Sequence, residues 1–269
     1  MVQQTLRELV ATRRAKIGTF LIEFSTPGIG QILKAAGSDY AVLDMEHSGF
    51  GFDTLKQMLR YMQAGDMPTI VRAPSRHYHH IARALDMGAE GVMLPMVGSA
   101  EEAREIVAHA KYPPDGHRGV ALGIAHDRYR PGPVLEKLRD ANRRTTIFAQ
   151  IETRSGVNHA EAIAALDGID CLWIGQFDLS ASLGIAGRFD HPAFIAAEAA
   201  VQKACAKHKK SFGRLVPDVA TGIAKYKAGF DFICYSGDVW VLQAAMADGI
   251  GALRKACKGG RPARRGRAA

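Results

Sequence analysis

Short apolar runs of four to six residues recur along the chain, and each is bounded by polar or glycine-containing segments. Continuous apolar runs of this length that are rich in β-branched residues are typical of strands buried on both faces. The pattern predicts eight strands, at 17–22, 40–44, 69–72, 91–95, 147–152, 171–175, 212–216 and 230–235.

The segments between these runs have helical periodicity. They predict helices near 28–37, 52–64, 76–88, 99–111, 155–166, 191–210, 217–229 and 237–256. Several of these helices end at a glycine that precedes the next strand, as at Gly37, Gly88 and Gly229. Glycine at this place supplies the left-handed cap that turns the chain back toward the sheet.

Eight strand-then-helix units with continuous apolar strands favour a closed (β/α)₈ barrel of the TIM type over an open sheet. No shift in composition and no internal repeat marks a second domain, so we expect one barrel domain over 1–257. The loop 112–133 is rich in Pro, Gly and Arg and has neither strand nor helix periodicity. A loop of this length is expected to cover a site or form an interface.

Composition fits an ordinary globular chain better than a membrane or secreted protein. The 269 residues are 47% hydrophobic and 23% charged, no apolar run reaches the length of a membrane span, and the N-terminus does not resemble a signal peptide. The four cysteines are scattered without a Cys-x-x-Cys pair, as expected for reduced thiols. We therefore expect a cytoplasmic location.

The net charge of +8 is concentrated at the C-terminus. Five of the basic residues lie in the Gly/Pro/Ala/Arg-rich segment 258–269: Lys258, Arg261, Arg264, Arg265 and Arg267. This composition predicts a disordered tail. The rest of the chain has no stripe of interleaved basic and aromatic residues, so nucleic acid is not an expected partner, and a nucleic-acid-associated protein that uses the tail is the non-enzyme alternative.

Carboxylates at the ends of two predicted strands suggest a metal site. Glu152 follows Gln150 at the end of one strand, and Asp178 follows the Gly175 turn at the end of another. Carboxylate oxygens suit Mg²⁺ or Mn²⁺ and leave positions for water and a chelating substrate. The alternative is that each carboxylate caps the next helix, as Asp178 could for 179–182.

Two further strand ends supply a histidine and an arginine. His47 is a candidate base, with Asp44 holding its other ring nitrogen, and its alternative is an ordinary loop histidine. Arg72 is a candidate clamp for a carboxylate or enolate oxygen, and its alternative is an internal salt bridge to Glu152 or Asp44. Glu46 is expected to point away from its neighbours, in packing or loop bonding.

In this order, these residues belong to motifs that resemble a known family. The motifs are 43–47 (LDMEH), 71–72 (VR), 84–89 (ALDMGA), 94–97 (LPMV), 112–119 (YPPDGHRG), 150–153 (QIET) and 178–184 (DLSASLG). Over nearly all of 6–256 the chain resembles the HpcH/HpaI family of metal-dependent, class II pyruvate aldolases.

The resemblance implies a modified barrel of the phosphoenolpyruvate/pyruvate type, assembled as a homohexamer with the last helix exchanged between paired subunits. It implies cleavage and formation of 4-hydroxy-2-oxo acids through an enolate, with pyruvate or hydroxypyruvate and an aldehyde as small-molecule partners. The implied cofactor is a divalent metal, Mg²⁺, Mn²⁺ or Co²⁺.

The resemblance also assigns roles at the metal and substrate. Glu152 and Asp178 would hold the metal. Gln150 and the backbone of Phe177, which follows the Gly175 turn, would bind pyruvate beside it.

The acid–base roles come from the same resemblance. His47 would be the base, and Arg72 would stabilise the enolate. Asp86, reaching in from an adjacent subunit, would raise the basicity of His47, and Asp44 becomes the second choice for that role.

The chain departs from the family pattern near the expected aldehyde pocket. The metal loop usually reads Gly-Pro followed by a small residue, and here it is Gly175-Gln176-Phe177. Phe20 stands where a tryptophan is common, and the loop 25–28 is one residue longer. The enzyme alternative is a lyase for acyl-CoA esters of the citryl- or malyl-CoA type, which the aldolase-like stretch 44–47 disfavours.

Overall fold

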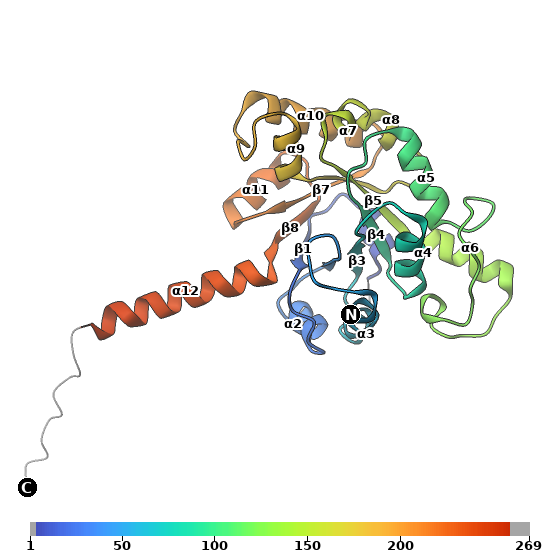
Figure 1. The fold of residues 1–269 in the computed structure, drawn as a ribbon, viewed down its shortest axis with the longest axis horizontal. Helices are drawn as coiled ribbons and strands as arrows, with labels where there is room; N and C mark the ends of the chain where they lie inside the picture. Colours follow the sequence, from blue (N-terminus) through green and yellow to red (C-terminus); the bar gives the residue numbers. More distant parts are fainter. Residues whose placement is uncertain (1–3, 259–269) are drawn as a thin grey trace, which may run out of the picture.

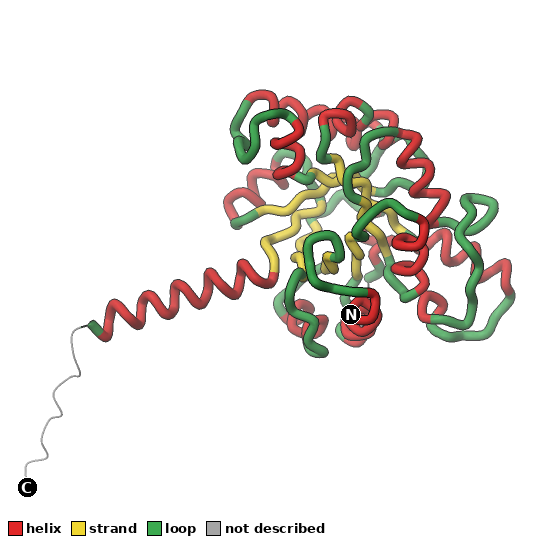
Figure 2. Tube along the Cα trace, viewed as in Figure 1, coloured by secondary structure: helices red, strands yellow, loops and turns green. Residues whose placement is uncertain are grey.

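The computed structural model describes residues 4–258, and its centre is a closed barrel of eight parallel strands (Figures 1 and 2). Each strand pairs with the next along the chain, and β8 pairs with β1 to close the barrel. The strands are β1 (Lys16–Leu21), β2 (Tyr40–Asp44), β3 (Thr69–Arg72), β4 (Gly91–Leu94), β5 (Thr146–Ile151), β6 (Cys171–Ile174), β7 (Ser211–Val216) and β8 (Phe232–Gly237). The predicted TIM-type barrel is confirmed, with bounds shifted by at most two residues.

Helices surround the barrel (Figure 1). They are α1 (Leu6–Val10), α2 (Ile29–Ala35), α3 (Phe52–Ala64), α4 (Tyr78–Asp86), α5 (Ala100–Ala110), α6 (Val134–Arg144), α7 (Arg154–Asn158), α8 (Ala160–Ala164), α9 (Gln176–Ser182), α10 (Pro192–Lys207), α11 (Val219–Lys227) and α12 (Asp238–Cys257), with a 3₁₀ turn η1 at Ala125–Asp127. The sequence did not predict α1, α6, α9 or η1, and the helix expected at 155–166 is divided into α7 and α8.

Two hydrophobic layers stabilise the barrel. The outer layer packs strand residues against the surrounding helices, and the inner layer fills the barrel with aromatic side chains. Phe232 lies at the centre of the inner layer, with ring centroids 5.0 Å from Tyr40 and 5.3 Å from Phe148. Leu6 and Leu9 of α1 are fully buried in this inner layer. Because they close the end where the strands begin, the end open to a substrate is where the strands finish.

Helix α12 departs from this packing, because it extends away from the barrel (Figure 1) and has no buried residue. The single chain does not show what covers it, so its exchange between subunits stays a prediction. Across residues 4–258, no helix is long and apolar enough to cross a membrane. The disorder predicted for the tail 258–269 falls, apart from Lys258, outside the described residues.

Candidate active site

The carboxyl ends of the strands surround an open pocket of about 320 Å³. It contains most of the candidate residues that the sequence placed at strand ends. The lining residues are Phe20, Ile22, Asp44, His47, Arg72, Gln150, Trp173, Ile174, Gly175, Gln176, Phe177, Asp178, Leu215 and Trp240. Segments far apart in sequence thus meet at one site, as expected at this end of a (β/α)₈ barrel.

Asp44 and Arg72 form a buried ion pair in this pocket. They are register partners on β2 and β3, so their side chains emerge side by side. Arg72 donates from Nε to Oδ1 of Asp44 at 2.8 Å and from Nη2 to Oδ2 at 2.6 Å. Burial lowers the pKa of Arg72, but the bonds to Asp44 outweigh it and raise that pKa above its ordinary value. These two parallel hydrogen bonds fix the plane of the guanidinium group.

This pair changes the role that the sequence suggested for Asp44. Its Oδ1 also accepts hydrogen bonds from the backbone N–H groups of Glu46, at 2.9 Å, and His47, at 3.4 Å. Asp44 therefore contacts the backbone of His47, and its side-chain partner is Arg72, not the imidazole. The internal salt bridge considered as the alternative for Arg72 is present, with Asp44 as its partner.

Glu46 is the carboxylate nearest to the His47 ring. Its Oε2 lies 3.9 Å from Nε2 of His47 and 3.3 Å from Nη1 of Arg72, yet this buried oxygen has no hydrogen-bond partner. Burial raises the pKa of Glu46; Arg72 opposes this shift, whereas the charges of Asp44 and Asp178 add to it. The His47 side chain is 63% exposed at the mouth of the pocket. Contrary to the sequence-based expectation, Glu46 faces the site.

Glu152 is a deeply buried carboxylate at this end of the barrel, with 1% of its surface exposed. Its Oε1 accepts from the backbone N–H of Met96 at 2.6 Å, and its Oε2 accepts from Nε2 of Gln150. Burial raises the pKa of Glu152 to about 7; these two hydrogen bonds oppose the shift, while the charges of Glu46 and Asp178 add to it. Its negative charge is therefore poorly compensated within the chain.

The turn at Gly175 is shaped around Glu152. A Cβ atom at position 175 would collide with Oε2 of Glu152 and approach Nε2 of Gln150 to 3.1 Å. Gly175 is also the N-cap residue of α9, which puts Asp178 in the first turn of that helix and not at its cap. The capping alternative for Asp178 is therefore wrong.

The oxygens gathered here fit a divalent cation. In residues 4–258, neither Glu152 nor Asp178 has an ion-pair partner, and the buried Oε1 of Gln150 and Oε2 of Glu46 accept no hydrogen bond. Unpaired buried oxygens of this kind are costly unless a donor or cation approaches them. The same residues contain no group of three or more His, Cys, Asp or Glu side chains arranged around a metal position. A cation here would thus have few protein ligands and several positions for water and substrate.

Asp86 does not lie in this pocket. It is the last residue of α4, at the end of the barrel where the strands begin, and it pairs with the buried Arg118 at 2.5 Å. Arg118 belongs to the loop 112–133 and stacks on Tyr112 at 4.6 Å. A single chain therefore does not bring Asp86 to His47, and its predicted role requires a second subunit.

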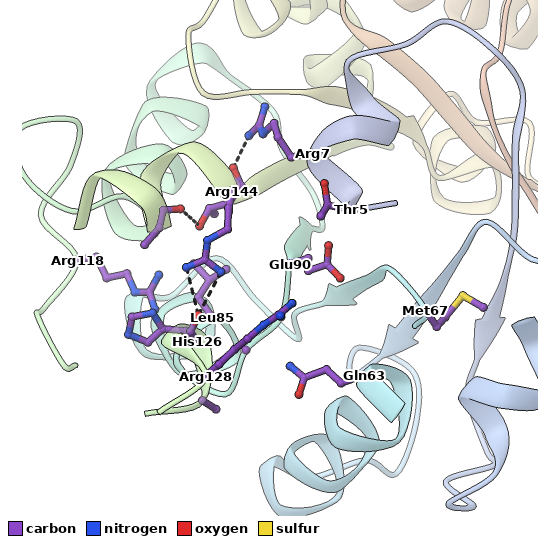
Figure 3. Close-up of a pocket in the computed structure, with 15 residues that line it drawn as sticks. Thr5, Arg7, Gln63, Met67, Leu85, Glu90, Arg118, His126, Arg128 and Arg144 are labelled. Carbon is purple, nitrogen blue, oxygen red and sulfur yellow. Dashed lines mark hydrogen bonds between the residues drawn. The ribbon is translucent and has the colours of Figure 1, made fainter. Parts of the chain in front are cut away.

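A smaller cavity of about 80 Å³ lies at this opposite end, next to the first residues of β4 and β5 (Figure 3). Arginine side chains dominate its wall: Arg7, Arg118, Arg128 and Arg144. Arg7 pairs with Asp170 at 2.6 Å, and Arg144 donates to the carbonyl oxygen of His126 at 3.2 Å. These contacts join α1, α6 and the loop 112–133 to the base of the barrel, which is a structural role.

A closed barrel that gathers a histidine, an arginine and buried carboxylates where its strands end is the architecture of a (β/α)₈ enzyme. Residues 16–239 match the family model described as HpcH/HpaI aldolase/citrate lyase. The chain belongs to that family. The predicted resemblance is confirmed, and the protein is an enzyme of a family of carbon–carbon lyases.

Individual relatives cover almost the whole chain. The 5-keto-4-deoxy-D-glucarate aldolase of Shigella boydii serotype 18 is 33% identical over 236 residues, which are 88% of this chain and 91% of the relative. The crystal structure of an HpcH/HpaI aldolase from Desulfitobacterium hafniense superimposes with a TM-score of 0.89 at 33% identity, covering 96% of this chain and 99% of that one. The citrate synthase SbnG is also similar, with a TM-score of 0.83 and 26% identity over 93% of this chain and 98% of that one.

Proposed function

We propose that the protein is a divalent-metal-dependent aldolase that cleaves and forms 4-hydroxy-2-oxo acids, with pyruvate or hydroxypyruvate and an aldehyde as the two fragments. The observation that carries this proposal is Glu152, a buried carboxylate with a raised pKa that has no cationic partner among residues 4–258 and faces other unpaired oxygens. Relatives at about one-third identity that are named aldolases support it.

Glu152 and Asp178 would hold the cation, which we expect to be Mg²⁺, Mn²⁺ or Co²⁺. When bound, such a cation withdraws electron density from the C2 carbonyl of a 2-oxo acid and so makes its C3 protons more acidic. Gln150 and the backbone N–H of Phe177 would orient the oxo acid against the turn at Gly175.

Arg72 would stabilise the charge that develops during the reaction. In the cleavage direction a base takes the proton of the C4 hydroxyl, the C3–C4 bond breaks, and its electron pair forms the enolate with negative charge on the C2 oxygen. Arg72 lies in the same pocket, and the bonds to Asp44 hold its guanidinium in one plane before the reaction begins. Donors preorganised in this way stabilise the transition state without reorganisation.

His47 would exchange the protons. It would take the C4 hydroxyl proton and return a proton to C3 of the enolate, which yields pyruvate. Its exposure at the pocket mouth allows exchange with solvent, and Oε2 of Glu46 lies 3.9 Å from its Nε2. In the assembled protein, Asp86 of an adjacent subunit would raise the basicity of His47, as the family resemblance implies.

The test is pyruvate release from a 4-hydroxy-2-oxo acid before and after exhaustive treatment with EDTA. The proposal predicts that activity is lost on chelation and returns with added Mn²⁺, Mg²⁺ or Co²⁺. Unchanged cleavage after chelation would refute the metal-dependent reaction. Turnover of citryl-CoA or malyl-CoA in place of the oxo acid would favour the acyl-CoA lyase alternative.

The basic tail is not needed for this chemistry. Deleting 258–269 should leave turnover unchanged, because the catalytic pocket is built from residues 20–240. A full-length protein without turnover that binds nucleic acid in a salt-dependent way, and loses this binding on the deletion, would instead favour the non-enzyme alternative.

A further inference from the structure

The catalytic pocket has a polar half and an apolar half. Asp44, His47, Arg72, Gln150 and Asp178 form the polar half, where the proposed function places the 2-oxo acid. Aromatic and aliphatic side chains from β1, β6, β7, α9 and α12 form the other half: Phe20, Ile22, Trp173, Phe177, Leu215 and Trp240. The aldehyde must occupy this second half, because the first is filled by the reacting oxo acid.

The apolar half lies directly beside the reacting groups. The ring of Phe20 is 4.9 Å from the guanidinium carbon of Arg72, and Trp173 packs edge-on against Phe20 with centroids 6.3 Å apart. Both aromatic side chains are at least 97% buried, so they form a fixed wall. A substituent on the aldehyde carbon would contact this wall first.

Within one chain, residues 4–258 offer this pocket no unengaged permanent positive charge that could bind a second carboxylate. Among the described residues that line it, Arg72 is the one side chain with a permanent positive charge, and it is engaged by Asp44 and Glu46. A carboxylate or several hydroxyl groups on the aldehyde would lose water against the apolar half without gaining partners there. Such desolvation without compensating hydrogen bonds is unfavourable.

Phe177 extends the apolar surface to the mouth of the pocket. Its side chain is 64% exposed, although it is held in place by edge-on packing against Phe189 at 5.3 Å, which in turn packs on Phe194 at 5.5 Å. An anchored phenyl group that stays exposed at a pocket mouth retains apolar area that a ligand can cover. Trp240, 47% exposed, borders the same pocket.

We infer that the aldehyde accepted and released by this enzyme is apolar, with an aliphatic or aromatic substituent, and that Phe177 is a specificity-determining residue that contacts this substituent. The inference rests on the proposed aldolase function and names its substrate class. It separates this chain from relatives named for 5-keto-4-deoxy-D-glucarate, which is a hydroxylated dicarboxylate.

The experiment measures kcat/KM for the addition of pyruvate to propanal, butanal, pentanal and hexanal with Mn²⁺ present, and compares glyceraldehyde and glyoxylate. The linear aldehydes have nearly equal intrinsic reactivity. The change in kcat/KM from one aldehyde to the next therefore measures contact of the added methylene with the apolar half. We expect kcat/KM to rise about threefold to fourfold for each methylene that is buried. Glyceraldehyde and glyoxylate should be poorer acceptors than hexanal.

Two variants test the role of Phe177. Phe177→Ser should flatten the rise along the series, and Phe177→Leu should retain part of it. Leu135→Ser is the matched control, because Leu135 is 67% exposed on α6 and lies outside the pocket. If kcat/KM rises as steeply with aldehyde chain length in Phe177→Ser as in the wild type, the assignment of Phe177 is wrong.

The outcomes for wild-type protein separate the two proposals. If pyruvate exchanges its methyl protons with solvent but the series is flat, or glyoxylate is preferred to hexanal, the apolar acceptor is wrong and the aldolase function stands. If neither pyruvate nor hydroxypyruvate exchanges its C3 protons with solvent, the proposed function fails and the inference fails with it.

Discussion

Glu152 combines deep burial with hydrogen bonds that keep its carboxylate in place. Met96 and Gln150 donate to it, and the Gly175 turn leaves just enough room for its Oε2. Because a proton and a metal ion compete for the same oxygens, the raised pKa of about 7 makes the charge of this residue sensitive to pH in the neutral range.

Metal affinity should therefore depend on pH. The folded-state pKa lies above the ordinary 4.5, so the metal-free protein takes up a proton as pH falls below about 7, and its stability falls as pH rises from 4.5 to 7. Mn²⁺ affinity, measured by titration calorimetry, should weaken about tenfold per pH unit below this pKa. Glu152→Gln should remove most of the affinity, whereas Glu161→Gln, at an exposed pair with Lys207, should not change it. An affinity that is constant from about pH 5.5 to about pH 8.5 is incompatible with Glu152 as a ligand.

The pair of Asp44 and Arg72 gives a second prediction at this scale. Arg72→Lys keeps the charge but loses the planar fork, so turnover should fall about 10²–10³-fold. Asp44→Asn should also lower kcat, because Arg72 loses its charged partner, but it should leave the acid limb of the pH–rate profile in place, since Asp44 does not touch the His47 ring. A shift of that limb in Asp44→Asn would show that Asp44 tunes His47 instead.

At the scale of secondary structure, the turn between β6 and α9 brings the two candidate metal ligands together. Gly175 allows the chain to pass close to Glu152 and then starts α9, whose first turn carries Asp178. Leu179 of α9 is fully buried in the hydrophobic core and anchors the helix there. Small changes in this turn should therefore act on both ligands at once.

Gly175→Ala tests the turn. Its methyl group would displace Glu152 or the start of α9, so Mn²⁺ affinity and turnover should both fall at least tenfold, a loss of about 1.4 kcal/mol of binding free energy. Far-ultraviolet circular dichroism should still show a folded barrel. Gly51→Ala is the control, because Gly51 has a φ of −83° and open space where the methyl group would lie. Wild-type affinity in Gly175→Ala would show that the turn does not position the ligands.

The strands were predictable from sequence because each is a continuous apolar run, and the glycine caps were predictable because Gly37, Gly88 and Gly229 do have positive φ angles. Three helices were missed for physical reasons. Helices α1 and α9 are too short to show periodicity, and α6 has few apolar residues and buries just Ala141 among its eleven. These helices are held by their surroundings more than by their own pattern.

The site was predictable in position but not in its contacts. Residues at strand ends meet at one end of a barrel, and this placed His47, Arg72 and Asp178 in one pocket. The bond between Asp44 and Arg72 depends on the register of β2 against β3, and the inward direction of Glu46 depends on the loop that follows β2. Neither is encoded in local spacing.

At the scale of the whole molecule, α12 leaves a large apolar surface without a partner. The helix has 20 residues, none of them buried, and it exposes Trp240, Val241, Leu242, Met246, Ile250 and Leu253. An exposed apolar helix face of this extent marks a surface that packs against protein. From the resemblance to aldolases with an exchanged last helix, we propose that the partner is a second copy of this chain, in a homohexamer.

Sedimentation velocity tests this assembly. The wild-type protein should sediment as a species several times larger than the 29.1 kDa chain, with the hexamer as the expected mass. The double variant Met246→Glu and Ile250→Glu should dissociate to smaller species, since it places charges in the apolar contact. Lys255→Glu, beyond the apolar residues near the end of the helix, serves as the charge control. A monomeric wild type would contradict both helix exchange and the supply of Asp86 by a neighbour.

The most direct test of the central claim is exchange of the pyruvate methyl protons with D₂O, followed by proton NMR. It needs no aldehyde, so it isolates the formation of the enolate from the choice of acceptor. The account predicts exchange that requires Mn²⁺, Mg²⁺ or Co²⁺, that stops after EDTA treatment, and that falls about 10²-fold or more in His47→Ala and Arg72→Ala. Exchange at the wild-type rate in metal-free protein, or in Arg72→Ala, would contradict it.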